Sequence, residues 1–182
     1  VWAKRSELFD YNMPYPRIST TGSHFAYLKV AEGCNHRCAF CVIPTIRGKF
    51  RSRSMSSILQ EATRLRDQGV QEVAVIAQDT TAWGLDLGTN IVELLRELAA
   101  LDIPWIRLLY TYPTSISQEL LELLSNTPNL VKYVDLPLQH VAGNVLRRMG
   151  RPGDFTSNRR LIETIRTQVP GVTIRSSFIV GF

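Results

Sequence analysis

The stretch Val73-Ala-Val-Ile-Ala77 decides the fold. Five successive apolar residues are typical of a β-strand buried on both faces, and such strands belong to parallel sheets that are covered by helices. Helical patterns flank this strand on both sides, at 54–68 and at 90–101. Since strands and helices alternate, the sequence predicts an α/β fold with a mostly parallel sheet.

Both flanking helices carry signals at their ends. In the helix expected at 54–68, Ser57 and Gln60 offer a capping box and Gly69 marks the end. In the helix expected at 90–101, Asn90 and Glu93 form the cap.

The same alternation continues along the chain. Strands are expected at 26–31, 73–77, 105–110, 131–136 and 172–180, and further helices at Ser115, around Val145 and near Leu161. Five strands separated by helices form a βαβ series, whereas a closed barrel of this kind needs eight. The last run, 176–182, is an apolar strand with no helix to cover it, which suggests an excerpt from a longer protein.

Length and composition are those of an ordinary globular protein. The chain has 182 residues, of which 45% are hydrophobic and 20% charged, so we expect one domain with an apolar core. No stretch approaches the ~20 apolar residues of a membrane span, and charges interrupt the N-terminus before a signal peptide could form. A cytoplasmic protein is the default. Residues 1–24 are expected to be a linker, and 25–182 the core domain.

The formal net charge of +5 permits an anionic partner such as RNA but does not require one. The run from Arg47 to Arg53 is rich in cations and has no acid, which makes it a candidate lip for an anionic partner beside the cysteines. A second group of cations follows near residue 150 and consists of Arg147, Arg148 and Arg151. A third group, Arg159 and Arg160, fits the exposed face of a helix.

All three cysteines lie in one short segment after the first expected strand, Glu32-Gly-Cys-Asn-His-Arg-Cys-Ala-Phe-Cys41. Their spacing, C-x3-C-x2-C, and their odd number argue against disulfides and indicate metal or redox chemistry. Such a loop can wrap three thiolates around an iron–sulfur cluster and leave one iron open. A zinc site would instead need His24 or His36 as fourth ligand. Loops after the strands hold the chemistry in βα barrels, which favours a catalytic site.

The cysteine spacing, with the aromatic Phe40 before the third cysteine, resembles the signature of radical S-adenosylmethionine (SAM) enzymes. An ordered set of further motifs resembles the methylthiotransferase branch of these enzymes more closely. The matching segments are Cys34–Cys38, Ser52–Arg53, Val75–Thr80, Asp135–His140, Arg151–Gly153 and Phe178–Phe182. The resemblance implies a partial (β/α) TIM-like barrel of the radical SAM type, truncated after about five strands.

The cofactors follow from the same resemblance. It implies a [4Fe–4S] cluster on Cys34, Cys38 and Cys41, with SAM chelating the open iron. One electron from the cluster would split SAM, and the resulting 5′-deoxyadenosyl radical would take a hydrogen atom from an unactivated C–H bond. The cofactors carry this chemistry, while the protein supplies position and excludes water. No residue is assigned a catalytic role of its own.

The resemblance also implies which residues contact SAM. The expected set is Phe40, Gln78, Asp79, Gln139, Arg175 and Gly181, with His140 beside Gln139. Gln78 and Asp79 would lie near the methionyl group, Gln139 near the ribose or the reacting centre, and Gly181 near adenine. Arg175 could reach the SAM carboxylate. The structural alternatives are a turn or cap at Gln78 and Asp79, a satisfied polar loop at His140 and a plain strand end at Gly181.

Two groups of the methylthiotransferase branch compete. His36-Arg37 and Gln78-Asp-Thr80 resemble the RimO group, which modifies the β-carbon of an aspartate in small-subunit ribosomal protein S-twelve. The alternatives are the MiaB group, which modifies an isopentenyl-adenosine of tRNA, and a non-enzymatic iron–sulfur or zinc module that docks on RNA.

The RimO resemblance further implies a set of partners and missing parts. The implied partners are the ribosomal protein or small ribosomal subunit and an electron donor of the flavodoxin or ferredoxin type, for a monomer that contacts no membrane. A second [4Fe–4S] cluster in an N-terminal domain and a β-rich C-terminal domain would lie outside this sequence.

Overall fold

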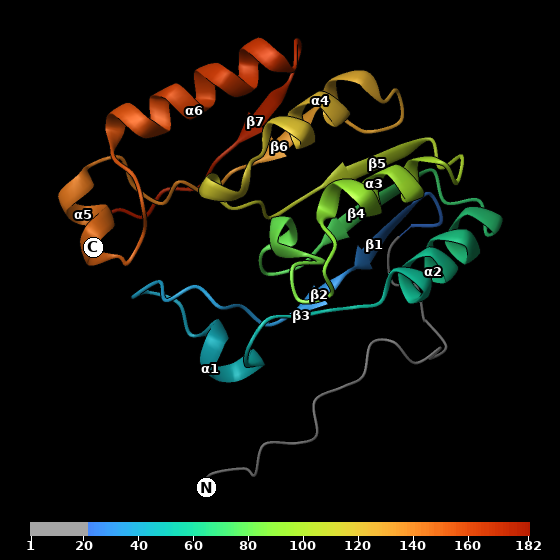
Figure 1. Ribbon diagram of the computed structural model, residues 1–182, viewed down its shortest axis with the longest axis horizontal. Coiled ribbons are helices and arrows are strands. Elements are labelled where there is room, and N and C mark those ends of the chain that lie inside the picture. The colour runs from blue at the N-terminus through green and yellow to red at the C-terminus, as the bar shows by residue number, and fades with distance from the viewer. Residues whose placement is uncertain (1–21) are drawn as a thin grey trace, which may run out of the picture.

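Strands and helices alternate along the computed structural model, which describes residues 22–182 (Figure 1). The helices are α1 (Ile43–Arg47), α2 (Met55–Asp67), α3 (Ile91–Ala99), α4 (Gln118–Asn126), α5 (Gly143–Arg148) and α6 (Phe155–Gln168), with 3-10 helices η1 (Thr80–Ala82) and η2 (Pro113–Ser115). The strands are β1 (Phe25–Lys29), β2 (Ala31–Glu32), β3 (Arg51–Ser52), β4 (Glu72–Ile76), β5 (Trp105–Leu108), β6 (Tyr133–Asp135) and β7 (Thr173–Arg175). The linker expected at 1–24 lies mostly outside the described residues.

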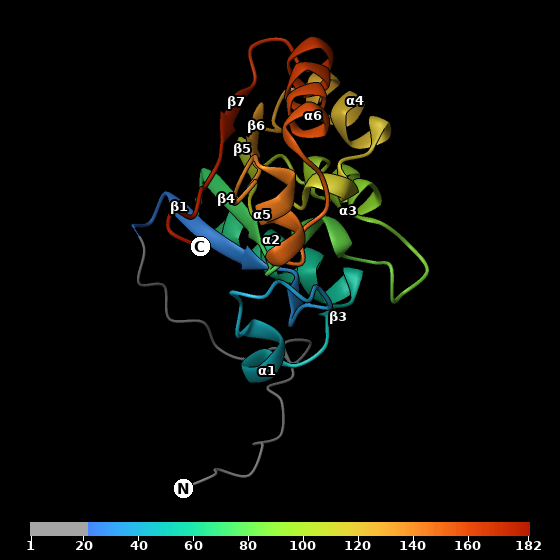
Figure 2. The ribbon, with the colours of Figure 1, turned by 90° about the vertical axis from the view of Figure 1, so that its left-hand side faces the viewer.

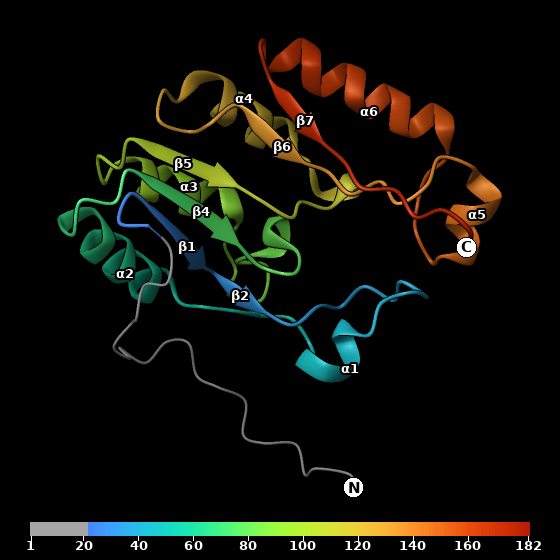
Figure 3. The ribbon, with the colours of Figure 1, turned by 180° about the vertical axis from the view of Figure 1, so that it is seen from behind.

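The parallel strands lie side by side in the order in which they occur in the chain. β1 pairs with β4 and β4 with β5, both in parallel, and β6 and β7 form a second parallel pair. A parallel bridge between Ile106 and Leu130 connects β5 to the chain that leads into β6. Figure 3 shows the five strands next to one another. The sequential parallel order is that of a segment of a βα barrel, and it confirms the predicted βαβ series.

Helices cover one face of this sheet. α2, α3, α4 and α6 lie in front of the strands in Figure 1 and behind them in Figure 3, and the side view of Figure 2 separates the two layers. Each helix turns an apolar stripe to the sheet. In α3, for example, Leu94, Leu95 and Leu98 are fully buried, and burying a leucine side chain stabilises the fold by about 1.5–3 kcal/mol.

β4 occupies the centre of the three-stranded sheet, and it is buried on both faces as its apolar run predicted. Val73, Ala74 and Val75 are all 0% exposed. Because successive side chains of a strand point to opposite faces, this burial shows that both faces of β4 are covered.

An unpredicted ribbon carries the cysteine segment. β2 and β3 pair in antiparallel fashion, with Ala31 opposite Ser52 and Glu32 opposite Arg51. The chain between them, including α1, therefore forms a closed loop, residues 33–50, which we call the cysteine loop. Gly33 has φ +79°, and a Cβ atom there would lie 2.2 Å from the carbonyl oxygen of Lys49. The two ends of the loop thus meet at a position where only glycine fits.

Two helix starts differ from the prediction. The cap of α2 is Ser54, whose hydroxyl accepts from the backbone N–H of Ser57, so the capping box expected at Ser57 and Gln60 is wrong. The cap of α4 is Ser117 rather than Ser115, because Ser115 belongs to the 3-10 helix that begins at Pro113. At α3 the Asn90 part of the predicted cap is confirmed, since its side chain accepts from two backbone N–H groups, whereas the Glu93 carboxylate accepts from the Thr89 hydroxyl.

Two strands are shorter than predicted. The expected strand at 172–180 keeps a continuous ladder only over Thr173–Arg175, because the Ser176 hydroxyl donates to the Leu136 carbonyl and accepts from the Leu138 N–H in place of the backbone. Parallel pairing resumes in a single bridge between Gln139 and Phe178. The expected strand at 105–110 ends at Leu108, just before Tyr110 takes a left-handed φ of +58°. A side-chain hydroxyl and a local backbone turn therefore end these strands.

The helices of residues 22–182 do not include one that is long and apolar enough to cross a bilayer.

Candidate active site

A cavity of about 480 Å³ opens where the parallel strands end, a volume typical of small-molecule sites. Its walls come from the cysteine loop and from the segments that follow β4, β5 and β6. The lining residues include Cys34, His36, Cys38, Phe40, Cys41, Gln78, Tyr110, Tyr112, Gln139 and Arg151. The carboxyl ends of parallel strands are where barrel and doubly wound enzymes place their sites.

The three cysteines share this cavity as free thiols. Cys34 is buried, Cys38 is half-buried and Cys41 is exposed. Burial raises the pKa of the Cys34 thiol, an effect that Asp79 and the other two cysteines reinforce and that the backbone N–H of His36 opposes. Burial therefore disfavours a thiolate at Cys34 that has no positive charge beside it.

Three cysteine side chains around one cavity are the donor set that an iron–sulfur cluster uses. Across residues 22–182, no three His, Cys, Asp or Glu side chains lie in an arrangement that could hold one metal ion. A single zinc ion needs its ligands to converge within about 2.3 Å of one point. In an iron–sulfur cluster each thiolate binds a different iron, so three thiols that face one cavity suffice.

The two histidines considered as zinc ligands lie in different parts of the fold. His24 precedes β1 and its carbonyl accepts from Gln71 and Glu72, at the opposite end of the sheet from the cavity. His36 lines the cavity, and its Nε2 lies 2.6 Å from Oδ2 of Asp79. His24 therefore lies away from the cysteines, whereas His36 shares their cavity.

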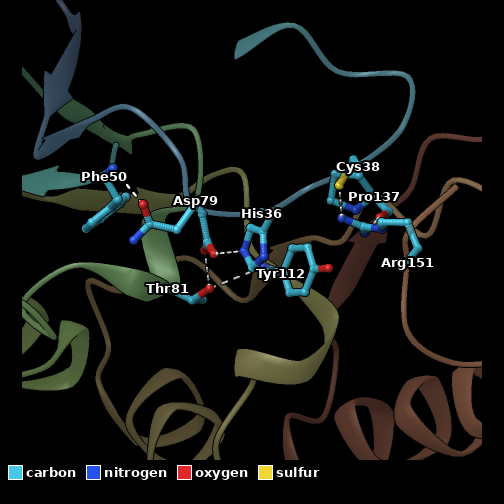
Figure 4. A network of polar contacts seen from close by, with 9 residues as sticks. His36, Cys38, Phe50, Asp79, Thr81, Tyr112, Pro137 and Arg151 are labelled. Atoms are coloured by element: carbon cyan, nitrogen blue, oxygen red, sulfur yellow. Dashed lines mark hydrogen bonds and ion pairs between the residues drawn. The ribbon is translucent and has the colours of Figure 1, made fainter. Parts of the chain in front are cut away.

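A polar network extends from His36 across the strand ends (Figure 4). Asp79 is 2% exposed and also accepts from the Thr81 hydroxyl at 2.6 Å. The Thr81 hydroxyl in turn accepts from the backbone N–H of Tyr112. The His36 and Tyr112 rings stack, with centroids 3.6 Å apart. The cysteine loop is thereby tied to the ends of both β4 and β5.

Several residues expected at the SAM site line the cavity: Phe40, Gln78 and Gln139. Oε1 of Gln78 is buried and has no hydrogen-bond partner among the described residues, which is unusual for a buried acceptor. Gln139 has a left-handed φ of +69°, and Tyr110, which also lines the cavity, has +58°. Strained backbone of this kind concentrates at functional sites.

Other expected site residues lie elsewhere. Asp79 stands behind His36 rather than at the cavity wall. Nη1 of Arg175 lies 3.6 Å from the buried Asp135 carboxylate, which raises the pKa of Arg175. Gly181 has φ +76° with no atom within 4 Å of a Cβ built there, and His140 accepts from the Ala142 N–H through Nδ1. Contact of these residues with SAM stays a prediction.

Two residues that line the cavity, Tyr112 and Arg151, are not among the predicted site residues. Tyr112 was not singled out, although the aromatic pair Tyr110 and Tyr112 directly after a strand was a usable signal. Arg151 was grouped only with the cations Arg147 and Arg148, but it is 9% exposed and its guanidinium lies over the Tyr112 ring.

The candidate lip at Arg47–Arg53 is only partly available to a partner. Arg53 is 6% exposed and bonds Glu61 and the Lys29 carbonyl, so its assignment to the lip is wrong. Arg47 is exposed and lies 3.8 Å from the Glu32 carboxylate. Arg159 and Arg160 are exposed on α6, as predicted.

Comparison with known proteins adds sequence relatives and structural neighbours. The sequence profile of the Radical SAM superfamily matches residues 28–182. The ribosomal protein uS12 methylthiotransferase RimO of Moorella thermoacetica is 52% identical over 170 residues, which are 92% of this chain and 39% of that protein. RimO of Solibacter usitatus is 51% identical over 181 residues, 97% of this chain and 39% of that protein. The chain therefore spans about two fifths of the length of these relatives.

Solved structures share the fold. The radical SAM methyltransferase TsrM of Kitasatospora setae, with cobalamin and a [4Fe-4S] cluster bound, matches with a TM-score of 0.65 at 20% identity, over 85% of this chain and 30% of that one. The cobalamin-dependent SAM radical enzyme OxsB, with aqua-cobalamin and SAM bound, matches with a TM-score of 0.67 at 14% identity, over 84% and 23%. These likenesses confirm the predicted fold class, α/β with a partial TIM-like barrel.

Proposed function

Because the chain belongs to the radical SAM superfamily, we propose that it forms the catalytic core of a RimO-type methylthiotransferase. The whole protein would add a methylthio group to the β-carbon of an aspartate in ribosomal protein uS12. The proposal is supported by the RimO proteins of two organisms, which are identical to this chain at about half of the aligned residues over nearly all of its length.

One observation carries the proposal: three free cysteines line one cavity, and Gln78, whose buried amide oxygen has no partner among the described residues, lines it with them. Cys34, Cys38 and Cys41 would each hold one iron of a [4Fe–4S] cluster and leave the fourth iron to SAM. When bound, the cluster and SAM supply the one-electron chemistry that makes a radical able to attack an unactivated C–H bond.

The chain's own residues would hold and orient the cofactors. The Gln78 amide oxygen would accept a hydrogen bond from the SAM amino group, which satisfies an otherwise orphaned acceptor. Phe40 and the stacked rings of His36 and Tyr112 form part of the cavity wall, where their apolar surface would limit the access of water. Asp79 fixes the orientation of His36 through the 2.6 Å contact to Nε2.

The partners follow from the same proposal. The substrate would be uS12, free or in the small ribosomal subunit, and a flavodoxin- or ferredoxin-type protein would supply the electron. A ribosomal substrate places the enzyme in the cytoplasm.

The test is the mass of the candidate substrates in cells that lack the gene. We expect uS12 from such cells to lose the mass of one methylthio group, while the modified nucleosides of tRNA stay unchanged. Native gene on a plasmid should restore the mass, and a Cys38→Ala gene should not. Loss of a methylthio group from tRNA, with uS12 unchanged, would assign the function to the MiaB alternative instead.

A further inference from the structure

Three flat side chains from separate parts of the chain form one stack at the cavity wall. The His36 ring lies parallel to the Tyr112 ring, with 3.6 Å between centroids and 7° between planes. The guanidinium carbon of Arg151 lies 4.3 Å from the centroid of the same Tyr112 ring. Since the imidazole fills one face at that distance, the guanidinium occupies the other, and Figure 4 shows Tyr112 between the two.

Both ends of this stack are anchored. At one end the buried Asp79 carboxylate holds the His36 ring. At the other end Nη2 of Arg151 donates to the Pro137 carbonyl at 2.6 Å, and Nη1 lies 3.8 Å from Sγ of Cys38. The side chain of Arg151 therefore spans from the end of β6 to the second cysteine.

The backbone around Arg151 docks on the same part of the cysteine loop. The N–H of Ala39 donates to the Met149 carbonyl at 2.8 Å. At Gly150, with φ +67°, a Cβ atom would lie 2.6 Å from the Arg37 carbonyl oxygen. The end of α5 thus contacts the residues on both sides of Cys38, and this close approach depends on a glycine.

The surroundings of Arg151 leave its charge unbalanced. Within residues 22–182 its polar and aromatic partners are a carbonyl oxygen, a phenol ring and a thiol, and none of them is a carboxylate. A buried cation without a counter-anion is costly, and the cost falls when negative charge arrives beside it. The group placed to receive that charge is the sulfur of Cys38.

We propose that Arg151 is a positioning residue for Cys38, which holds this sulfur at the cavity wall and stabilises its negative charge when it binds the cluster. The inference rests on the proposed function, because it concerns the cluster that the three cysteines would hold. Hydrogen bonds to cluster sulfurs tune the reduction potential. A positive group beside Cys38 favours the reduced cluster, which carries one more electron, so Arg151 raises the midpoint potential and slows the loss of iron.

The first test measures the cluster itself in the protein as its gene encodes it, reconstituted anaerobically. Redox titration followed by electron paramagnetic resonance should give a more negative midpoint potential for Arg151→Met than for the native protein, with Arg151→Lys in between. Iron should pass to a chelator several-fold faster from Arg151→Met. Arg147→Met removes an equal charge from an exposed position of α5 and should change neither quantity.

The second test needs no cluster. In the apo protein, hydrogen exchange at the Ala39 amide should be faster in Arg151→Met and in Gly150→Ala than in the native protein. Gly171→Ala is the matched control, because Gly171 has φ +80° but no atom within 4 Å of a Cβ there. It introduces the same backbone strain without the clash and should leave Ala39 protected.

The outcomes separate the two proposals. If native protein binds the cluster and cleaves SAM, but Arg151→Met and Arg151→Lys keep the native potential and rate of iron loss, the inference about Arg151 is wrong and the proposed function stands. Unchanged protection of Ala39 in Gly150→Ala would contradict the docking of α5 on the loop. If Cys38→Ala keeps a full cluster and cleaves SAM, the proposed function itself fails.

Discussion

Arg51 and Arg53 are two positions apart, yet their surroundings differ completely. Arg53 is buried and bonds Glu61, Ser57 and the Lys29 carbonyl. Arg51 is half-buried, and its side chain donates a hydrogen bond to the Lys49 carbonyl. A run of cations in a sequence cannot show which member folds inward, because that depends on Glu61, a residue of the following helix.

The two arginines should therefore respond differently to charge reversal. Arg53→Glu places two carboxylates together in a buried site, so we expect a loss of about 3–5 kcal/mol in the free energy of unfolding. Arg51→Glu should change it by less than about 0.5 kcal/mol. Urea unfolding of the apo protein measures both. Equal effects of the two substitutions would show that Arg53 is not buried in the folded protein.

Gln78 offers the sharpest test of SAM binding at the residue scale. Because its buried Oε1 lacks a partner among the described residues, Gln78→Ala should weaken SAM binding by about tenfold or more, the effect of losing one hydrogen bond to a charged group. Iron content should stay native, since Gln78 is no cluster ligand. Calorimetric titration with SAM measures the affinity of the native protein and of Gln78→Ala. Unchanged affinity would place the SAM amino group elsewhere.

At the scale of elements, the junction of β2 with the cysteine loop depends on Gly33. A Cβ atom at this position would collide with the backbone of Gly48 and Lys49. Gly33→Ala should therefore separate the two ends of the loop and reduce the iron bound on reconstitution, whereas Gly69→Ala, at φ +85° with no neighbour within 4 Å, should bind the native amount. The measurement is the amount of iron bound per protein after reconstitution of each variant. Native iron in Gly33→Ala would mean that the loop does not need this closure.

The cap of α6 gives a prediction about pH. The backbone and hydroxyl of Ser157 donate to the Asp154 carboxylate and lower its pKa. Because the folded-state pKa lies below the unfolded value, the ionised cap adds stability above the unfolded pKa and loses it as pH falls through the folded one. The stability gap between native protein and Asp154→Ala should therefore shrink between about pH 5 and about pH 2.

A neutral cap provides the control for this pH dependence. The Asn90 side chain caps α3 without a charge, so Asn90→Ala should cost about 1 kcal/mol at every pH in the same series of urea unfolding curves. A gap for Asp154→Ala that stays constant down to the lowest pH would contradict the capping role of the carboxylate.

The elements themselves were largely predictable, and their ends were not. Buried strands and amphipathic helices show in the sequence because periodicity reports burial, as at β4 and α3. The cap of α2 was misplaced because Ser54, Ser56 and Ser57 offer similar side chains, and only the backbone conformation selects Ser54. The ribbon of β2 and β3 has two residues in each strand, too few for any pattern to show.

At the scale of the whole molecule, the cavity collects residues from distant parts of the chain. The cysteines are local, so their spacing alone predicted a shared site. His36 and Asp79 are 43 positions apart, and Cys38 and Arg151 are 113 apart. Only the arrangement of parallel strands brings these pairs together. The site of the cysteines was therefore predictable from the sequence, whereas the contact between Arg151 and Cys38 was not.

The central claim is that the cavity at the strand ends binds a cluster on three cysteines and uses it on SAM. The most direct measurement is the 5′-deoxyadenosine formed from SAM under reducing, anaerobic conditions by the native protein and by Cys34→Ala, Cys38→Ala and Cys41→Ala. The account predicts 5′-deoxyadenosine and methionine in equal amounts from the native protein and none above background from any of the three variants. Full 5′-deoxyadenosine formation by any one of them would contradict it.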